Sequence, residues 1–157
     1  MPEIRHLAEQ TRTLAAFVSM NATLGAGRRG LEMGAAYARE RVVWKAPIGA
    51  HQGISHPLAE AKIELELARL MQQKAAALYD AGAPAGEPSN MAKFAAAEAG
   101  IKCVDRAIQT HGGNGFSLEY GLTQMYWAVR LVRTAPVSRE MILNYVAEHS
   151  LGLPRSY

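Results

Sequence analysis

The stretch LAEAKIELELARLMQQKAAAL, residues 58–78, carries the strongest structural signal of the chain. Its apolar residues recur at steps of three and four, the spacing that places side chains on one face of an α-helix. The main stripe consists of Leu58, Ala61, Leu65, Ala68, Met71, Ala75 and Leu78. A second, shorter stripe lies beside it and ends at Lys74: Ile63, Leu67 and Leu70. An apolar face this wide predicts a helix inside a helical bundle.

This stretch belongs to the second of two predicted helices, which are separated by a loop. The first covers residues 2–41 and has a weak middle, because Gly25, Gly27 and Gly30 each cost about 1 kcal/mol relative to alanine in a helix interior. Such glycines are tolerated best where another helix packs closely or where the helix kinks. Residues 42–53 form an ordered loop, and the second helix covers residues 55–81, with Ser55 as its N-cap and Pro57 in its first turn.

The C-terminal half predicts three more helices. A helix over residues 88–110 ends at HGGNG, where adjacent glycines allow a left-handed exit. Its inward residues are predicted to be Met91, Phe94, Ala97, Ile101, Val104 and Ile108, with Cys103 at the edge of that face. Ser117 is expected to cap the next helix, and Pro136 to open the last one, which Gly152 and Pro154 end. About five helices and no strand predict a single all-α domain over residues 1–157, built as an up-and-down bundle.

Composition excludes several classes of function. The chain has 157 residues, of which 49% are hydrophobic and 20% charged, as in one soluble globular domain. A net charge of +3 without a run of like charges argues against nucleic-acid binding but permits an anionic ligand. The single cysteine, Cys103, excludes an internal disulfide and is interpreted as a buried structural thiol. The sequence has no apolar run long enough to predict a membrane span, and its N-terminus has no signal-peptide core, so the cytoplasm is the expected location. No metal site is expected.

Two loop-bearing stretches carry a more specific signal. ARERVVWKAPIGAHQGISHPLAEAKIELELAR covers residues 38–69, and AIQTHGGNGFSLEYGL covers residues 107–122. They hold, in order, an arginine, a nearby aromatic residue, a glutamine after a proline- and glycine-bearing loop, and a QxxGGxG turn. This order and spacing resembles the C-terminal all-helical domain of acyl-CoA dehydrogenases, from about Leu14 to Ala147.

The resemblance implies a set of contacts to FAD. Arg41 is expected near the FAD pyrophosphate, because a guanidinium can bind phosphate oxygens in a bidentate way. Trp44 is expected to pack against the flavin nucleotide, and His51 and Gln52 to approach its adenosine end. The second group contacts the ADP moiety of an FAD held mainly by a neighbouring subunit, and comprises Gln109, Gly112 and Gly113, with Gly115 in the same turn. Without the resemblance, these glycines equally suit a simple helix stop.

The catalytic base that the resemblance implies is missing. Acyl-CoA dehydrogenation needs a carboxylate to remove a proton next to the thioester carbonyl. The two positions at which the family places a glutamate are occupied here by Pro136 and Ala15. Glu140 lies one turn further on and is expected to face solvent or the helix dipole instead. No residue of this chain is therefore predicted to be catalytic.

Three interpretations stay open at this point. The chain can be a domain of an FAD-dependent acyl-CoA dehydrogenase, whose N-terminal and middle domains are absent from these 157 residues. It can be a non-catalytic assembly module or partner subunit in a heteromeric enzyme, or a descendant that lost the cofactor. The resemblance implies a dimer or tetramer in which acyl-CoA binds only to the complete assembly. A generic helical regulator with accidental loop similarity is the remaining alternative.

Overall fold

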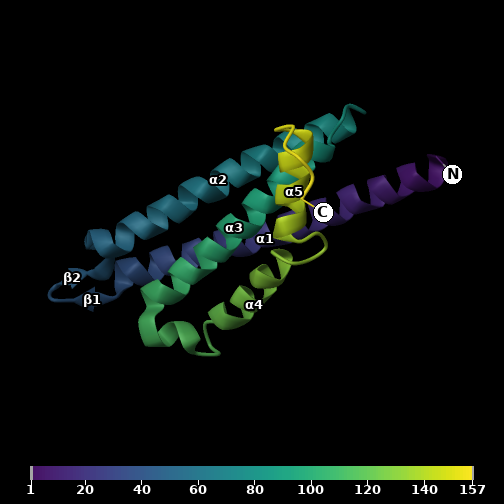
Figure 1. Ribbon diagram of the computed structural model, residues 1–157. Helices are drawn as coiled ribbons and strands as arrows, with labels where there is room; N and C mark the ends of the chain where they lie inside the picture. Colours follow the sequence, from purple (N-terminus) through teal and green to yellow (C-terminus); the bar gives the residue numbers. More distant parts are fainter. Residues whose placement is uncertain (1, 157) are drawn as a thin grey trace.

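The computed structural model describes the backbone of residues 2–156 and the side chains of residues 16–156. Five α-helices carry the fold over this range (Figure 1). They are α1 (Pro2–Glu40), α2 (Gln52–Asp80), α3 (Gly86–His111), α4 (Leu122–Val132) and α5 (Arg139–His149). Between α1 and α2 lie β1 (Val42–Val43), β2 (Ala46–Pro47) and the 3-10 helix η1 (Ile48–Ala50), and the 3-10 helix η2 (Gly112–Phe116) follows α3. The predicted all-helical class is confirmed.

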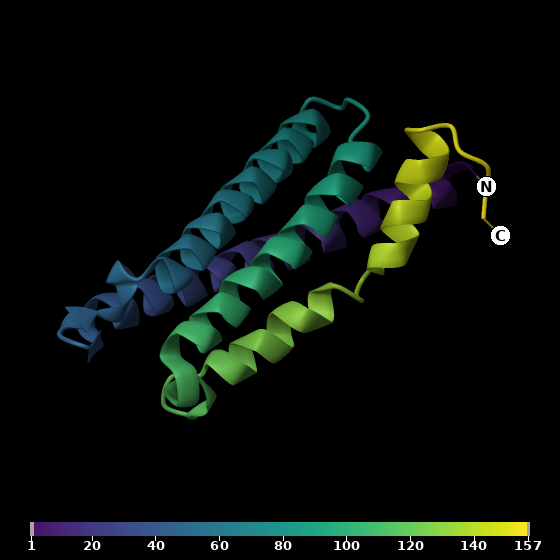
Figure 2. The same cartoon turned by 60° about the vertical axis from the view of Figure 1, so that its left-hand side comes forward.

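The three long helices lie side by side, with α3 packed against both α1 and α2 (Figures 1 and 2). The shorter α4 runs back along α3 and α1, and α5 contacts α3 near the end where the chain termini lie. The core between the long helices contains Met20, Leu24 and Leu31 from α1 and Leu65 from α2. None of the helices within residues 2–156 is long and apolar enough to cross a membrane.

Glycines let α1 and α3 approach closely. A Cβ atom added at Gly27 would lie 3.2 Å from the Cα of Gly100, and one added at Gly30 would lie 3.3 Å from the Cα of Val104. On the opposite helix, a Cβ at Gly100 would lie 3.1 Å from the carbonyl oxygen of Thr23. The backbone therefore approaches at distances that a side chain would prevent. Close packing is the reason that the weak middle of α1 forms one continuous helix.

Small residues also form the buried face of α3, which differs from the predicted one. Most of the large residues predicted to point inward are only partly buried: Met91, Phe94, Ile101 and Ile108. The fully buried positions are Ala92, Lys93, Ala96, Ala99, Cys103, Val104 and Ala107, among others. The physical reason is the central place of α3, which faces two helices at short distance and has room for small side chains at most of these positions. Lys93 is the exception, and its ammonium donates to the Val137 carbonyl oxygen. Cys103 accordingly lies in the core, with no exposed surface, and not at the edge of the face.

The beginning of α2 differs from the predicted one. The helix starts at Gln52, three residues early, with His51 as its N-cap. The Ser55 hydroxyl donates to the carbonyl oxygen of His51 at 3.3 Å, so the predicted capping role of Ser55 is wrong. Extended backbone at His51, with ψ at 128°, ends the preceding loop and starts the helix without a side-chain cap.

The later helices also begin after their predicted caps. Ser117 accepts a hydrogen bond from the amide of Glu119 at 3.2 Å within a turn, and α4 starts only after Gly121, whose φ is +66°. Pro136 lies ahead of α5, which is capped by Ser138; the Ser138 hydroxyl accepts from the Met141 amide at 3.3 Å. The predictions that Ser117 caps α4 and that Pro136 opens α5 are therefore wrong.

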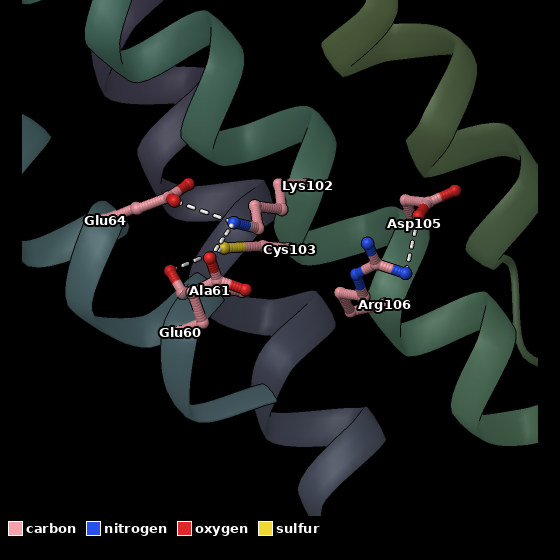
Figure 3. A network of polar contacts seen from close by, with 7 residues as sticks. All are labelled: Glu60, Ala61, Glu64, Lys102, Cys103, Asp105 and Arg106. Atoms are coloured by element: carbon pink, nitrogen blue, oxygen red, sulfur yellow. Dashed lines mark hydrogen bonds and ion pairs between the residues drawn. The ribbon is translucent and has the colours of Figure 1, made fainter. Parts of the chain in front are cut away.

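A polar network links the outer sides of α2 and α3 (Figure 3). The Lys102 ammonium lies 3.1 Å from a carboxylate oxygen of Glu60 and 2.7 Å from one of Glu64. Beside it, the Cys103 thiol donates to the carbonyl oxygen of Ala61 at 3.5 Å. This network joins the two helices at the border between their buried and exposed faces.

The two apolar stripes of α2 differ in burial. In the main stripe Ala61, Leu65, Ala68 and Ala75 are buried, as predicted. The second stripe is exposed, with 62% of the surface of Ile63, 60% of Leu67 and 58% of Leu70 accessible. The prediction that the whole wide face lies inside the bundle is therefore wrong for the second stripe, because α3 and α1 pack against the other face of α2.

Candidate functional site

The loop after α1 forms a tight hairpin that the sequence did not predict. Val43 pairs with Ala46 and Val42 with Pro47, so Trp44 and Lys45 form a two-residue turn. Both have positive φ, 50° for Trp44 and 69° for Lys45, as a type I′ turn requires. Glycine and asparagine are the usual residues at such turn positions. VVWKAP contains neither, so the sequence did not indicate a hairpin. The turn leaves 86% of the Trp44 surface exposed.

Arg41 and His51 mark the two ends of this hairpin segment. The Arg41 amide donates to the Tyr37 carbonyl oxygen at 2.9 Å, which closes α1, and the Arg41 carbonyl oxygen accepts from the Ile48 amide at 2.8 Å. The Trp44 and His51 rings meet edge to face, with 6.1 Å between centroids. The backbone of Arg41 is thus held firmly while its side chain is exposed.

The second predicted cluster lies where α3 ends. Gly112 has φ +59° and ψ −134°, a conformation that L side chains rarely adopt, so glycine ends the helix here. At Gly115 a Cβ would lie 2.6 Å from the carbonyl oxygen of Ile108, which also requires glycine. Gly113 has open space where a Cβ would be. The backbone around Gly112 and Gly113 is therefore accessible to a ligand, while Gly115 serves packing.

An aromatic cluster joins the end of α1, next to the hairpin, to the turn that follows α3. The Tyr37 ring stacks on the His111 ring with 4.3 Å between centroids, and Tyr120 meets His111 edge to face at 4.8 Å. The Asn114 amide group donates to the Tyr37 hydroxyl at 3.0 Å. Both views show the β1–β2 hairpin and the turn after α3 at the same end of the bundle, opposite the chain termini (Figures 1 and 2). The end of α1 is thus tied directly to η2.

Sequence reasoning missed the role of this cluster. His111 is buried with 4% of its surface exposed, and its Nδ1 lies 2.7 Å from the Ala107 carbonyl oxygen one turn earlier. The cluster forms part of the wall of a shallow groove of about 540 Å³, together with Arg29, Glu32, Glu40 and Glu119. Tyr37 and His111 are 74 residues apart in the sequence, so no local pattern could have paired them.

The seven residues predicted to contact a cofactor are all exposed: Arg41, Trp44, His51, Gln52, Gln109, Gly112 and Gly113. Among the described residues, none of the side chains of Arg41, Gln52 and Gln109 makes a hydrogen bond or ion pair. The guanidinium and the two amide groups are consequently available to a ligand. These are the donors that suit phosphate oxygens and a nucleotide edge.

The loop before α5, which has Pro136 at the position expected for a catalytic glutamate, is held by α3. The Lys93 side chain is 2% exposed and its ammonium donates to the Val137 carbonyl oxygen. Burial lowers the pKa of Lys93, and the nearby carboxylates of Glu140 and Glu98 oppose that shift. Pro136 is exposed in this loop and has no group that can accept a proton. Lys93 supplies a donor here, but no base.

Glu140 and Ala15 are the two other positions considered for a catalytic base. Glu140 is exposed in the first turn of α5, where its carboxylate faces solvent at the positive end of the helix dipole, as expected. Ala15 belongs to α1, but its side chain lies outside the described residues. Among the side chains that the structure describes, no group of three His, Cys, Asp or Glu residues is placed to hold a metal ion.

Comparison with known proteins gives a consistent result. Residues 7–151 match the family "Acyl-CoA dehydrogenase, C-terminal domain". The chain is 57% identical over 136 residues to the acyl-CoA dehydrogenase FadE12 of Mycobacterium tuberculosis, which covers 85% of this chain and 35% of that protein. The chain thus spans about a third of the length of such relatives.

Solved structures agree in fold. A structure described as PigA with FAD and proline superposes with a TM-score of 0.86 at 28% identity, covering 90% of this chain and 37% of that one. The ChsE4–ChsE5 complex from Mycobacterium tuberculosis gives a TM-score of 0.82 at 30% identity, covering 90% of this chain and 39% of that one. The first neighbour contains FAD, and the second is a heteromeric complex.

Proposed function

Because this chain belongs to the acyl-CoA dehydrogenase family as its C-terminal domain, we propose that it contributes FAD contacts to an acyl-CoA-oxidising flavoprotein. The observation that carries the proposal is a shared location. The side chains of Arg41 and Gln52, which bond to no described residue, lie at one end of the bundle. The exposed Gly112–Gly113 turn lies at the same end, joined to them through Tyr37 and Asn114. This end is where the phosphates of a dinucleotide would bind.

Each group has a distinct part in holding the cofactor. The Arg41 guanidinium would bind pyrophosphate oxygens, and the exposed Trp44 ring would pack on the nucleotide. The Gly112–Gly113 backbone would approach the ADP moiety of an FAD held mainly by a second subunit or domain. When bound, flavin accepts the hydride that leaves the acyl-CoA thioester. Acyl-CoA itself would bind only in an assembly that supplies the remaining domains.

A fluorescence titration tests the cofactor contact. The sequence has two tryptophans, so the Trp127→Phe variant leaves Trp44 as the sole reporter at this end. Adding FAD to this variant, alone and together with a polypeptide that spans the part of an acyl-CoA dehydrogenase beyond this domain, should quench the emission of Trp44 in a saturable way. In the same background Arg41→Ala should raise the Kd for FAD by about tenfold, the effect of losing one charge-assisted phosphate contact.

The control is a second exposed arginine outside the site. Arg69 lies in α2 and its Nε is 3.5 Å from a carboxylate oxygen of Glu66, so Arg69→Ala should leave the Kd for FAD unchanged. ADP should compete with FAD if the nucleotide half is what binds. Absence of saturable quenching in every assembly, or equal losses from Arg41→Ala and Arg69→Ala, would remove the cofactor part of the proposal.

A non-catalytic partner subunit is the second candidate function. It is favoured by Pro136, which cannot act as a base, and by the exposed apolar stripe on α2. Introducing Pro136→Glu into the intact assembly distinguishes the two. A gain in acyl-CoA dehydrogenation would indicate a degraded enzyme site, whereas unchanged activity would indicate an architectural subunit. The variant must first be shown to unfold at the same temperature as the parent chain.

A further inference from the structure

A polar groove of about 360 Å³ lies between α1 and α2, away from the candidate cofactor contacts. Steps of three and four along each helix bring its lining side chains to one space, and the main ones are Asn21, Leu24 and Arg28 on α1 and Arg69, Gln72 and Gln73 on α2. None of the described residues that line the groove is acidic. Its walls therefore carry two guanidinium groups and three amide groups.

A buried amide fixes the polar groups on the two sides of this groove. Gln72 has only 9% of its surface exposed, and its Nε2 donates to the Oδ1 of Asn21 at 2.9 Å. This hydrogen bond joins α2 to α1 and leaves the Nδ2 hydrogens of Asn21 without an acceptor among the described residues. Leu24, which is 5% exposed, adds a small apolar surface. The groove thus presents N–H donors whose positions are set by the packing of two helices.

The two arginines of the groove differ in what they already bind. The Nε of Arg69 lies 3.5 Å from one carboxylate oxygen of Glu66, and the Lys62 ammonium lies 2.5 Å from the other. Arg28 is exposed, and its side chain makes no hydrogen bond or ion pair with any described residue. Arg28 consequently supplies a guanidinium that is available to a ligand.

The electrostatic potential beside the groove is positive. The pKa of the Glu66 carboxyl group lies below its ordinary value, first because the Lys62 ammonium donates to it, and further because the charges of Lys62, Arg69 and Arg28 favour the ionised form. Three cations thus act on one carboxylate, so positive charge is left in excess. An anion that enters the groove meets this excess at Arg28.

We propose that the groove between α1 and α2 binds a small oxyanion, a phosphate or a carboxylate, with the Arg28 guanidinium as its main donor. Two parallel N–H groups of a guanidinium match two oxygens of either ligand group. The Nδ2 hydrogens of Asn21 and the exposed amide of Gln73 offer further donors from both helices. A volume of about 360 Å³ is near the lower limit of small-molecule sites, so the ligand is a small metabolite and not a dinucleotide.

This groove is separate from the proposed FAD contacts. Arg28 lies about 18 Å along the helix axis from Glu40, the last residue of α1, whereas Arg41 follows that residue. The inference therefore goes beyond the proposed function, and either can fail alone. Trp44 emission reports FAD at the end of the bundle, and signals from Arg28 and Asn21 report the groove.

NMR spectroscopy of the isotope-labelled full chain tests the binding. Inorganic phosphate should move the cross-peaks of the Arg28 Nε–H and the Asn21 side-chain amide in a saturable way, whereas sodium chloride at equal ionic strength should not. Butyrate is the carboxylate probe. Tighter binding of phosphate would identify a phosphate ester as the ligand class, and tighter binding of butyrate would identify a carboxylate.

Substitutions of Arg28 test its role as the main donor. Followed at the Asn21 amide, Arg28→Ala should raise the Kd for the tighter probe by about tenfold. Arg28→Lys keeps the charge but loses the paired N–H groups, and should raise it by about threefold. The matched control is Arg29→Ala, because Arg29 is the adjacent residue, faces a different groove and lies 3.9 Å from Glu32. Its Kd should stay within about twofold of the parent value.

Three outcomes would overturn the inference. The first is the absence of saturable shifts with both probes, or shifts that sodium chloride reproduces. The second is an equal loss of affinity from Arg28→Ala and Arg29→Ala, which would indicate a general effect of charge and no built site. The third is an Arg41→Ala variant that abolishes the shifts at Arg28, which would place the bound anion at the end of the bundle. Circular dichroism melting checks that every variant keeps the fold.

Discussion

Cys103 shows how surroundings set the chemistry of a single side chain. The residue has no exposed surface, and burial raises the pKa of its thiol from an ordinary value of 9.0 to about 12, with the Glu64 carboxylate adding to the shift. The thiolate is the reactive form of cysteine, so this thiol is inert in the folded chain at neutral pH. The sequence-based interpretation of Cys103 as a buried structural thiol is confirmed.

We predict that a thiol reagent at pH 8 modifies Cys103 only when the chain unfolds. Labelling should be slow in buffer and immediate in denaturant. The matched control is the double variant Val18→Cys/Cys103→Ala, in which the thiol occupies a site that is 71% exposed and should react at once in buffer. Rapid labelling of native Cys103 would contradict its burial between the long helices.

The same shift has a consequence for stability at high pH. Because the folded-state pKa is raised, the thiol stays protonated in the folded chain up to about pH 12. In the unfolded chain it ionises from about pH 9 upward, which favours unfolding. The contribution of Cys103 to the free energy of unfolding is therefore fully present below pH 9 and is lost as the pH rises toward 12.

At the scale of elements, the contact between α1 and α3 depends on glycines that are not equivalent. A Cβ added at Gly100 would lie 2.4 Å from the side-chain methyl group of Thr23, whereas a Cβ added at Gly25 would have nothing within 4 Å. Both lie in helix interiors with ordinary backbone angles. Sequence alone assigns both the same cost of about 1 kcal/mol relative to alanine. Only the distance to the neighbouring helix distinguishes the two positions.

We predict opposite effects for two glycine-to-alanine substitutions. Gly25→Ala should raise the free energy of unfolding by about 0.5–1 kcal/mol, because it lowers the entropy of the unfolded chain without a clash. Gly100→Ala should lower it by about 1–3 kcal/mol, since the new methyl group forces α1 and α3 apart. Urea unfolding measures both. Equal effects of the same sign would show that α1 and α3 do not pack at this short distance.

For the whole molecule, polar contacts to α3 add to buried apolar residues such as Val129 and Ile142 in holding the C-terminal part to the long helices. A Glu98 carboxylate oxygen lies 3.0 Å from Arg133 Nε and accepts a hydrogen bond from Arg139 Nε at 3.1 Å, so one residue of α3 holds both ends of the segment between α4 and α5. The Arg139 guanidinium also lies 5.2 Å from the centroid of the Phe94 ring. Lys93 adds a bond to the middle of the same segment.

We predict that Glu98→Gln loosens α5 more than it destabilises the rest. Two guanidinium groups would then face each other without a counter-charge, and the free energy of unfolding should fall by roughly 1 kcal/mol, because solvent partly screens the site. Amide hydrogen exchange should rise first in α5. Glu32→Gln is the control, because Glu32 pairs with Arg29 at 3.9 Å on an exposed surface and should change stability by less than about 0.5 kcal/mol.

Much of this architecture could be derived from residue order alone. Helical periodicity identified the five helices and the buried stripe of α2, because spacing along a helix decides which side chains share a face. The motif residues from Arg41 to Gly113 could also be picked out from the sequence, because their pattern is local. Glycine at position 112 ends a helix with positive φ, and Arg41 directly follows the end of another. Their exposure is consistent with ligand contact, while the contact itself stays a prediction.

Tertiary structure decided the rest, because periodicity marks a face but not the distance to its neighbour. The two apolar stripes of α2 look alike in sequence, and only the position of α3 buries one and leaves Leu67 exposed. The buried face of α3 consists of small residues since two helices approach it closely. The pairing of Tyr37 with His111, which ties both halves of the candidate site together, exists only once the chain between them has folded back.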